Sequence, residues 1–239
     1  MDRITLDLLN QNHITQRQID RLISRGVDEG TVLFTLIKVG AVSVNFIKRF
    51  IVEQIRTGKY DLSILKNYTF IKEAEVLQAL AEALHIGFLD LDSIDMDYKL
   101  AEKVPLNQLQ KYNVLPISQD DLNIVVAFED PFNIEAQEAI QRIFPRKPIK
   151  VHLATSRQIQ EYLFKIALKD SVKELVTNIR TELRTIGSIE EQQEASSILQ
   201  LIDVILNACI KSRASDIHIE PTEKNCVVRT RIDGNYVDT

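Results

Sequence analysis

Two short segments decide the fold of the carboxyl-terminal part of this chain: "ASDIHIEP" at Ala214–Pro221 and "CVVRTRI" at Cys226–Ile232. In both, charged or polar side chains alternate with apolar or β-branched ones, which is the two-residue period of a β-strand. The residues that join them, "PTEKN" at Pro221–Asn225, are typical of a turn. The two segments therefore predict an antiparallel β-hairpin.

One register of this hairpin matches the side chains on both of its faces, with opposite charges paired on one face and apolar side chains on the other. It places Asp216 opposite Arg231, His218 opposite Arg229 and Ile219 opposite Val228. Asp233-Gly234 then marks a second tight turn, and "NYVDT" begins another strand.

The charged face has four interpretations. A metal site would need Asp216, His218 and Glu220 to converge without two cations beside them. Arg229 and Arg231 lie beside them in the predicted register, so the metal interpretation is disfavoured. A catalytic cluster would need a nucleophile or a substrate pocket, and the pattern shows neither. A structural ion-pair face explains the residues. Alternatively, the two arginines point outward to an anion, because planar guanidinium groups suit phosphate.

The composition excludes several classes of protein. The chain has 239 residues and a net charge of −5, which argues against a nucleic-acid-binding domain. Its two cysteines, Cys209 and Cys226, are too few for a structural zinc site. The sequence has neither a signal peptide nor an apolar run long enough to cross a membrane, so a cytoplasmic location is expected.

The sequence predicts an α+β protein in four parts. We expect a helical hairpin module at residues 1–95, a small α/β domain at 96–168, a polar linker at 169–196, and the beginning of a second mixed domain at 197–239, which the chain leaves incomplete. Ser196 or Ser197 is expected to cap a buried helix, "ILQLIDVILNACIKSR", at the start of this last part.

The helical module contains a threefold repeat. Similar segments begin at Arg3, Thr31 and Tyr60, and each reads as a helix, a tight turn and a second helix. The turn positions hold Asn12, Gly40 and Thr69. Asparagine and glycine suit a left-handed turn conformation, whereas threonine suits it poorly.

The α/β domain has the predicted order αββαβα. Its helices are expected at "AEKVPLNQLQKY", at "NIEAQEAIQRIF" with Asn133 as cap, and at "RQIQEYLFKIAL" with Thr155 or Ser156 as cap. Its strands are expected at "NVLPIS", "LNIVVAFED" and "IKVHLA", and "QDD" is expected to turn between the first two.

These segments resemble the ATPases of type II secretion and type IV pilus assembly. The hairpin segments are similar to those in the domain that precedes the P-loop core of that family. The upstream segments "LAEALHIGFLDLD", "KVPLNQLQKYNVLPIS" and "LNIVVAFEDPFNIEAQEAI" resemble its amino-terminal module. The resemblance implies an amino-terminal regulatory and docking part, which links a hexameric motor to inner-membrane platform proteins on the cytoplasmic side of the membrane.

The chain lacks the phosphate-binding loop of such a motor. A Walker A loop has the sequence GxxxxGK[ST]. The single GK pair in this chain is Gly58-Lys59, and it lacks the rest of the motif. Glu53 stands at the position of the first glycine and Tyr60 at the position of the serine or threonine. We therefore expect no ATP hydrolysis by these residues alone. The resemblance implies that the full-length protein uses ATP and magnesium, and that Arg229 and Arg231 contact nucleotide phosphate there.

Some members of the family bind cyclic di-GMP through a repeated RLGxxLxxxG pattern. This sequence keeps Arg3, Leu8, Leu36, Gly40 and Gln54 at corresponding places. It departs from the pattern elsewhere. Thr5, Leu33 and Leu62 replace the first glycine, Thr31 and Tyr60 replace the arginine, and Asn12 and Thr69 replace the turn glycine. A cyclic di-GMP sensor and a scaffold without a ligand therefore remain as alternative functions.

Overall fold

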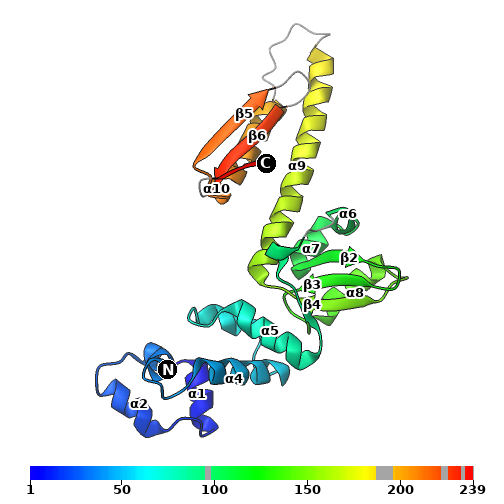
Figure 1. The fold of residues 1–239 in the computed structure, drawn as a ribbon. Helices are drawn as coiled ribbons and strands as arrows, with labels where there is room; N and C mark the ends of the chain where they lie inside the picture. Colours follow the sequence, from blue (N-terminus) through cyan, green and yellow to red (C-terminus); the bar gives the residue numbers. More distant parts are fainter. Residues whose placement is uncertain (95–97, 187–195, 222–225, 233–234, 239) are drawn as a thin grey trace. The chain divides into compact units, whose positions relative to one another are not determined.

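The computed structural model describes residues 1–94, 98–186, 196–221, 226–232 and 235–238. The chain forms two compact units. The first consists of Met1–Val104 and Gln108–Ile159, and the second of Pro105–Asn107 and Gln160–Thr239. The architecture mixes helices with two small sheets, as the α+β prediction requires (Figure 1).

The first unit is built from helices and four short strands. The helices are α1 (Arg3–Asn10), α2 (Gln16–Ile23), η1 (Glu29–Thr31), α3 (Val32–Lys38), α4 (Val44–Arg56), η2 (Leu62–Asn67), α5 (Glu73–Leu84), η3 (Leu91–Ser93), α6 (Tyr98–Ala101), α7 (Leu106–Tyr112) and α8 (Ile134–Ile143). The strands are β1 (Gly87–Phe88), β2 (Val114–Gln119), β3 (Ile124–Phe128) and β4 (Ile149–Leu153).

The first two helical repeats form as predicted. Asn12 takes a left-handed conformation with φ of 59°, and Gly40 does so with φ of 75°. Each turn leads into a capped helix, because Thr15 and Gln18 form a capping box at α2 and the Ser43 hydroxyl accepts from the backbone N–H of Phe46 at α4.

The third repeat differs from the prediction. Its first helix, η2, is a 3₁₀ helix that is capped by Asp61, whose carboxylate accepts from the Ser63 N–H at 2.9 Å. Thr69 is not among the described residues with positive φ. A β-branched residue is strained in the left-handed region, so this turn cannot copy those at Asn12 and Gly40.

Helix α5 joins the helical module to the sheet of the first unit. It packs against α4 on one side and against β1 and β4 on the other (Figure 1). Leu153 of β4 belongs to the same buried cluster as the apolar residues of the helices. The module and the sheet therefore share one core, to which fully buried Leu8, Ile51 and Leu80 contribute.

The sheet of the first unit has the order β1-β4-β3-β2. The predicted β2–β3 hairpin forms, and its turn is held by Asp120, whose side chain accepts from the N–H groups of Leu122 and Asn123. Strand β4 pairs parallel with β3 and with β1. The sequence reading missed β1, because two residues are too few to show a strand period.

One predicted helix is divided in two. The segment "AEKVPLNQLQKY" was expected to be a single helix, but α6 ends at Ala101 and α7 begins at Leu106. Pro105 explains the break, because proline has no N–H to donate and disfavours the helical conformation at Val104.

The predicted helix caps of the α/β domain are present. Asn133 caps α8, since its side chain accepts from the N–H of Ala136 at 3.0 Å. The Thr155 hydroxyl accepts from the Gln158 N–H at the start of α9 (Ser156–Ile186). Helix α9 continues beyond the α/β domain, so residues 169–186 of the expected linker are helical, whereas residues 187–195 lie outside the described part of the chain.

The second unit contains α10 (Ser196–Lys211) and strands β5 (Asp216–Pro221), β6 (Cys226–Ile232) and β7 (Asn235–Asp238). Helix α10, which was expected to be buried, is buried only in part. Ala208 and Cys209 are buried, but an apolar stripe of the helix is exposed. The stripe consists of Ile198, Leu199, Ile202, Leu206 and Ile210.

Candidate functional site

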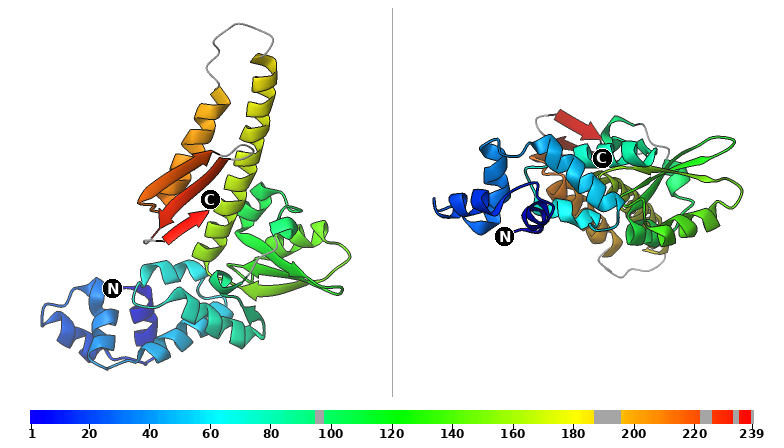
Figure 2. Two further views of the ribbon diagram at one scale, coloured as in Figure 1. Left: turned by 45° about the horizontal axis from the view of Figure 1, so that its top comes forward. Right: turned by 90° about the horizontal axis from the view of Figure 1, so that it is seen from below.

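The carboxyl-terminal hairpin forms in the predicted register. Strands β5 and β6 pair antiparallel, as Figure 2 shows, with Asp216 opposite Arg231 and His218 opposite Arg229. Strand β7 pairs with β6 on its other side. The two turns that join these strands, predicted at Pro221–Asn225 and Asp233-Gly234, include residues 222–225 and 233–234, which lie outside the described residues.

Two ion pairs lie on the charged face of this sheet. The Arg229 Nη1 donates to Glu220 Oε2 at 2.6 Å, and Arg231 Nη1 lies 3.8 Å from Asp216 Oδ2. Arg229 therefore pairs diagonally with Glu220 rather than with His218, the residue directly opposite it. The acidic and basic residues of the two strands form one continuous face, as their alternation predicts.

His218 contacts an aromatic ring on the third strand of the sheet, β7. The imidazole and the Tyr236 ring meet edge to face at 5.4 Å, and the Arg231 guanidinium lies 5.7 Å from the centre of the same ring. The register that puts Tyr236 opposite Arg231 explains both contacts. The signal was present in "NYVDT", where Tyr236 is the second residue after the predicted turn at Asp233-Gly234.

Both arginine side chains remain accessible to solvent. The side chains of Arg229 and Arg231 are 41% and 46% exposed, and those of their acidic partners are about as exposed. Ion pairs at this exposure contribute about 0–1 kcal/mol. Exposed guanidinium groups can donate hydrogen bonds to an anion as well as to these carboxylates.

The described residues contain no group of three His, Cys, Asp or Glu side chains placed to hold a metal ion. In the part of the chain that the structure describes, no helix is long and apolar enough to cross a membrane.

The five cyclic-dinucleotide candidates occupy different environments in the helical module. Leu8 and Leu36 are buried in its core, and Gly40 lies in a turn. Arg3 donates to the Lys59 carbonyl at 2.7 Å, and its guanidinium lies 4.8 Å from the centre of the Tyr60 ring. Gln54 is 5% exposed, and among the described residues no donor reaches its Oε1.

Two tyrosines that are not among the predicted site residues anchor the first helix. Tyr60 donates to Asp7 at 2.5 Å and Tyr68 donates to Asp2 at 2.9 Å. Burial raises the pKa of both phenols, and the neighbouring carboxylates raise it further. Both tyrosines belong to the third repeat, so these contacts tie it to the first.

Two protein families match this chain. Residues 84–169 match the MshEN domain, and residues 191–239 match the type II/IV secretion system protein family. The first match covers the α/β domain and the second covers α10 with the three-stranded sheet.

Similar curated proteins are assembly and secretion ATPases. The chain is 27% identical to the type IV pilus assembly ATPase PilB of Myxococcus xanthus, over 83% of this chain and 37% of the relative. It is 30% identical to PilB of Acinetobacter baylyi, over 65% and 29%, and 21% identical to the type II secretion system protein E of Xanthomonas campestris, over 77% and 34%. The chain thus spans about a third of the length of these relatives.

Solved structures show a more distant likeness. The structure of MshE with cdg is 23% identical and covers 55% of this chain and 94% of that one, with a TM-score of 0.42. The amino-terminal domain of XpsE is 16% identical and covers 57% and 95%, with a TM-score of 0.37. Structural likeness at this level supports no functional inference. The two family matches and the curated relatives identify the chain as an amino-terminal region of the secretion ATPases of type II secretion and type IV pilus assembly.

Proposed function

We propose that this chain is the regulatory and docking part of a secretion or pilus-assembly ATPase. In this proposal it links the motor to inner-membrane platform proteins from the cytoplasmic side. The full-length protein is a hexamer that hydrolyses ATP with magnesium. The residues of this chain supply contacts to the motor and to its partners, and they do not supply the phosphate-binding loop.

The observation that carries this proposal is the division of the chain into two compact units with different family matches. The MshEN match falls mostly in the first unit, and the secretion-protein match falls in the second. Helix α9 begins in the first unit and continues into the second. A chain organised in this way can hold a partner through one unit while the other serves the motor.

The arginine pair gives the second unit its role in the proposal. Arg229 and Arg231 are exposed on one face of a sheet and are held by weak surface ion pairs. In the full-length protein they contact the phosphates of bound ATP, where added positive charge stabilises the transition state of phosphoryl transfer. Asp216 and Glu220 hold the two guanidinium groups in place until nucleotide arrives.

A binding assay tests the docking role. The purified chain is mixed with the detergent-solubilised inner-membrane platform protein of the same system, immobilised on beads. We expect the chain to be retained on these beads and not on beads that carry an unrelated membrane protein of similar size. Equal recovery from both kinds of beads, or recovery from neither, contradicts the docking proposal.

A second candidate function is the binding of cyclic di-GMP, and Gln54 is the observation that favours it. A buried amide oxygen without a donor is costly, and a ligand that donates to it would remove that cost. Arg3, on the same module, is exposed and able to contact a phosphate or a guanine.

Calorimetry distinguishes this candidate from the others. Titration of cyclic di-GMP into the chain at tens of micromolar should release heat, and Gln54→Leu should abolish the signal while the helical content stays the same. Without any heat, the sensor function fails. If the platform protein also fails to bind, a scaffold without a ligand is left.

A further inference from the structure

Tyr236 lies beside Arg231 on the charged face of the three-stranded sheet. The two residues are directly opposite each other across the β6–β7 ladder, and the guanidinium carbon of Arg231 lies 5.7 Å from the centre of the tyrosine ring. An arginine and an aromatic ring attract each other over distances up to about 6 Å. Tyr236 is 57% exposed, so the contact forms at the surface, where a ligand can reach it.

His218 supports the tyrosine ring from the other side of the sheet. It belongs to β5 and Tyr236 belongs to β7, so the two rings meet across the middle strand, β6. They touch edge to face, and the Tyr236 hydroxyl lies 3.4 Å from Nε2 of His218. His218 is opposite Arg229, one row away from Arg231. The pair of rings therefore crosses β6 between the two arginines.

The two arginines of this face are held differently. Arg229 donates to Glu220 Oε2 at 2.6 Å, which is a charge-assisted hydrogen bond. Glu220 lies opposite Val227, so this arginine leans away from Arg231. Arg231 Nη1 lies 3.8 Å from Asp216 Oδ2, which is longer than a hydrogen bond. Arg231 thus combines a loose ion pair with an aromatic contact.

A carboxylate and an aromatic ring use different parts of a guanidinium group. The N–H groups point outward in the plane of the group, and a carboxylate accepts from them. An aromatic ring attracts the positive charge through its π system and need not take up these N–H groups. A phosphate and Asp216 therefore compete for the donors of Arg231, whereas Tyr236 can keep its contact while a phosphate is bound.

We propose that Tyr236 is a positioning residue, which holds the Arg231 guanidinium for the phosphates of ATP in the full-length protein. This inference rests on the function proposed above for Arg231. The ring limits the conformations of a long, flexible side chain before nucleotide arrives, so less entropy is lost when the phosphate contact forms. Tyr236 acts through Arg231, and His218 keeps the ring in place.

Nuclear magnetic resonance of this chain tests the contact on its own. The unaltered chain should show cross-peaks between the Arg231 side chain and the Tyr236 ring. Tyr236→Leu should move the Arg231 Nε–H resonance, because the ring that shifts it is gone, and Tyr236→Phe should move it less. Absence of the cross-peaks, or an Arg231 resonance that Tyr236→Leu leaves in place, overturns the inference.

The kinetics of the full-length ATPase test the consequence. Tyr236→Leu should lower kcat about threefold or more and leave KM for ATP within about twofold, because the charge of Arg231 acts in the transition state. Tyr236→Phe keeps the ring and should retain at least about half of the original kcat. Tyr112→Leu is the matched control and should leave kcat unchanged. Lys111 lies over the Tyr112 ring at 4.5 Å, in the other compact unit.

A double variant shows whether Tyr236 acts through Arg231. In the Arg231→Ala protein, Tyr236→Leu should cause no further loss of kcat, because the effects of two residues that work as one unit do not add. A further loss of about threefold in that background would mean that the tyrosine acts independently of the arginine, which overturns the inference. The same conclusion follows if Tyr236→Phe loses as much activity as Tyr236→Leu, since the ring would not be the part that matters.

The single variants separate this inference from the function on which it rests. If Arg231→Ala lowers kcat and Tyr236→Leu does not, the arginine keeps its proposed role and the positioning role of the tyrosine is overturned. If neither variant lowers kcat, the proposed role of Arg231 and the positioning role both fail.

Discussion

Arg231 lies directly opposite Asp216 across the β5–β6 ladder, with Nη1 and Oδ2 3.8 Å apart and both side chains nearly half exposed. The strand register places these two side chains opposite each other, and their ion pair adds little to the stability of that register. Thr230 of β6 is 2% exposed, whereas Ile217 and Ile219 of β5 are 36% and 55% exposed, so β6 supplies the buried side chain of the face opposite the charges. The charged face is therefore available for a task other than stability.

Removal of the acidic partner should have little effect on folding. Asp216→Ala is expected to change the free energy of unfolding by less than about 1 kcal/mol, because exposed ion pairs contribute little. Urea denaturation followed by circular dichroism measures this. A loss above about 2 kcal/mol would show that the pair is structural.

Two leucines on helix α1 should differ sharply in their effect on stability. Leu8→Ala is expected to cost about 2–5 kcal/mol, because Leu8 is fully buried and its loss leaves a cavity. Leu6→Ala, on the same helix but 42% exposed, should cost less than about 1 kcal/mol. Thermal denaturation of both variants provides the comparison. Similar losses would contradict the placement of Leu8 in the core.

Stability should depend on pH through the link between α4 and α5. Lys48 donates to Glu75, and this bond holds the pKa of Glu75 below its ordinary value of 4.5. A carboxyl with a lowered folded pKa stabilises the fold above its unfolded value, and the stabilisation is lost as the pH falls through the folded value. Lys48→Met should therefore reduce the loss of stability on acidification.

Urea denaturation between about pH 6 and about pH 3 measures this difference. Lys66→Met, which removes an exposed lysine from η2, should leave the pH dependence unchanged. Identical slopes for the Lys48→Met variant and the unaltered chain would show that the ion pair does not form in solution. The effect should be partial, because Lys72 also lies 3.7 Å from Glu75.

The elements with strong local signals were predictable from the sequence. The β5–β6 register follows from strict alternation, and the turns at Asn12 and Gly40 follow from residues that tolerate a left-handed backbone. Asn133 was recognised as a cap from its position before an amphipathic helix. In each case the physical cause lies within a few neighbouring residues.

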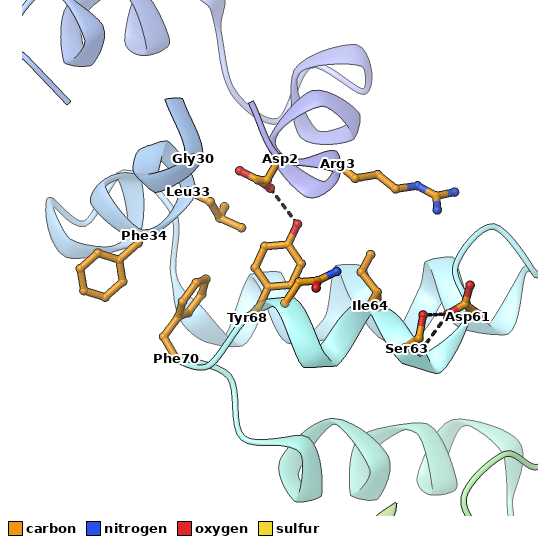
Figure 3. Close-up of a pocket in the computed structure, with 11 residues that line it drawn as sticks. Asp2, Arg3, Gly30, Leu33, Phe34, Asp61, Ser63, Ile64, Tyr68 and Phe70 are labelled. Carbon is orange, nitrogen blue, oxygen red and sulfur yellow. Dashed lines mark hydrogen bonds between the residues drawn. The ribbon is translucent and has the colours of Figure 1, made fainter. Parts of the chain in front are cut away.

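Features that depend on distant contacts were not predictable. Strand β1 has two residues, and its pairing with β4 gives it its structure. A pocket lined by Arg3, Leu33 and Asp61 joins residues from three repeats, so no single motif in the sequence outlines it (Figure 3). The exposed stripe on α10 was not predictable either. An apolar pattern shows which residues can be buried, and it does not show which of them another element covers.

The central claim is that Arg231 contacts the phosphates of ATP in the full-length protein. The turnover of ATP by the full-length protein carrying Arg231→Ala tests this claim most directly. Arg180→Ala, which removes an exposed arginine from α9, is the matched control. We expect Arg231→Ala to lower kcat about tenfold or more, with the melting temperature of this chain unchanged, and Arg180→Ala to leave kcat as it is. Unchanged turnover in the Arg231→Ala protein would contradict the account and leave the arginine face with a structural role alone.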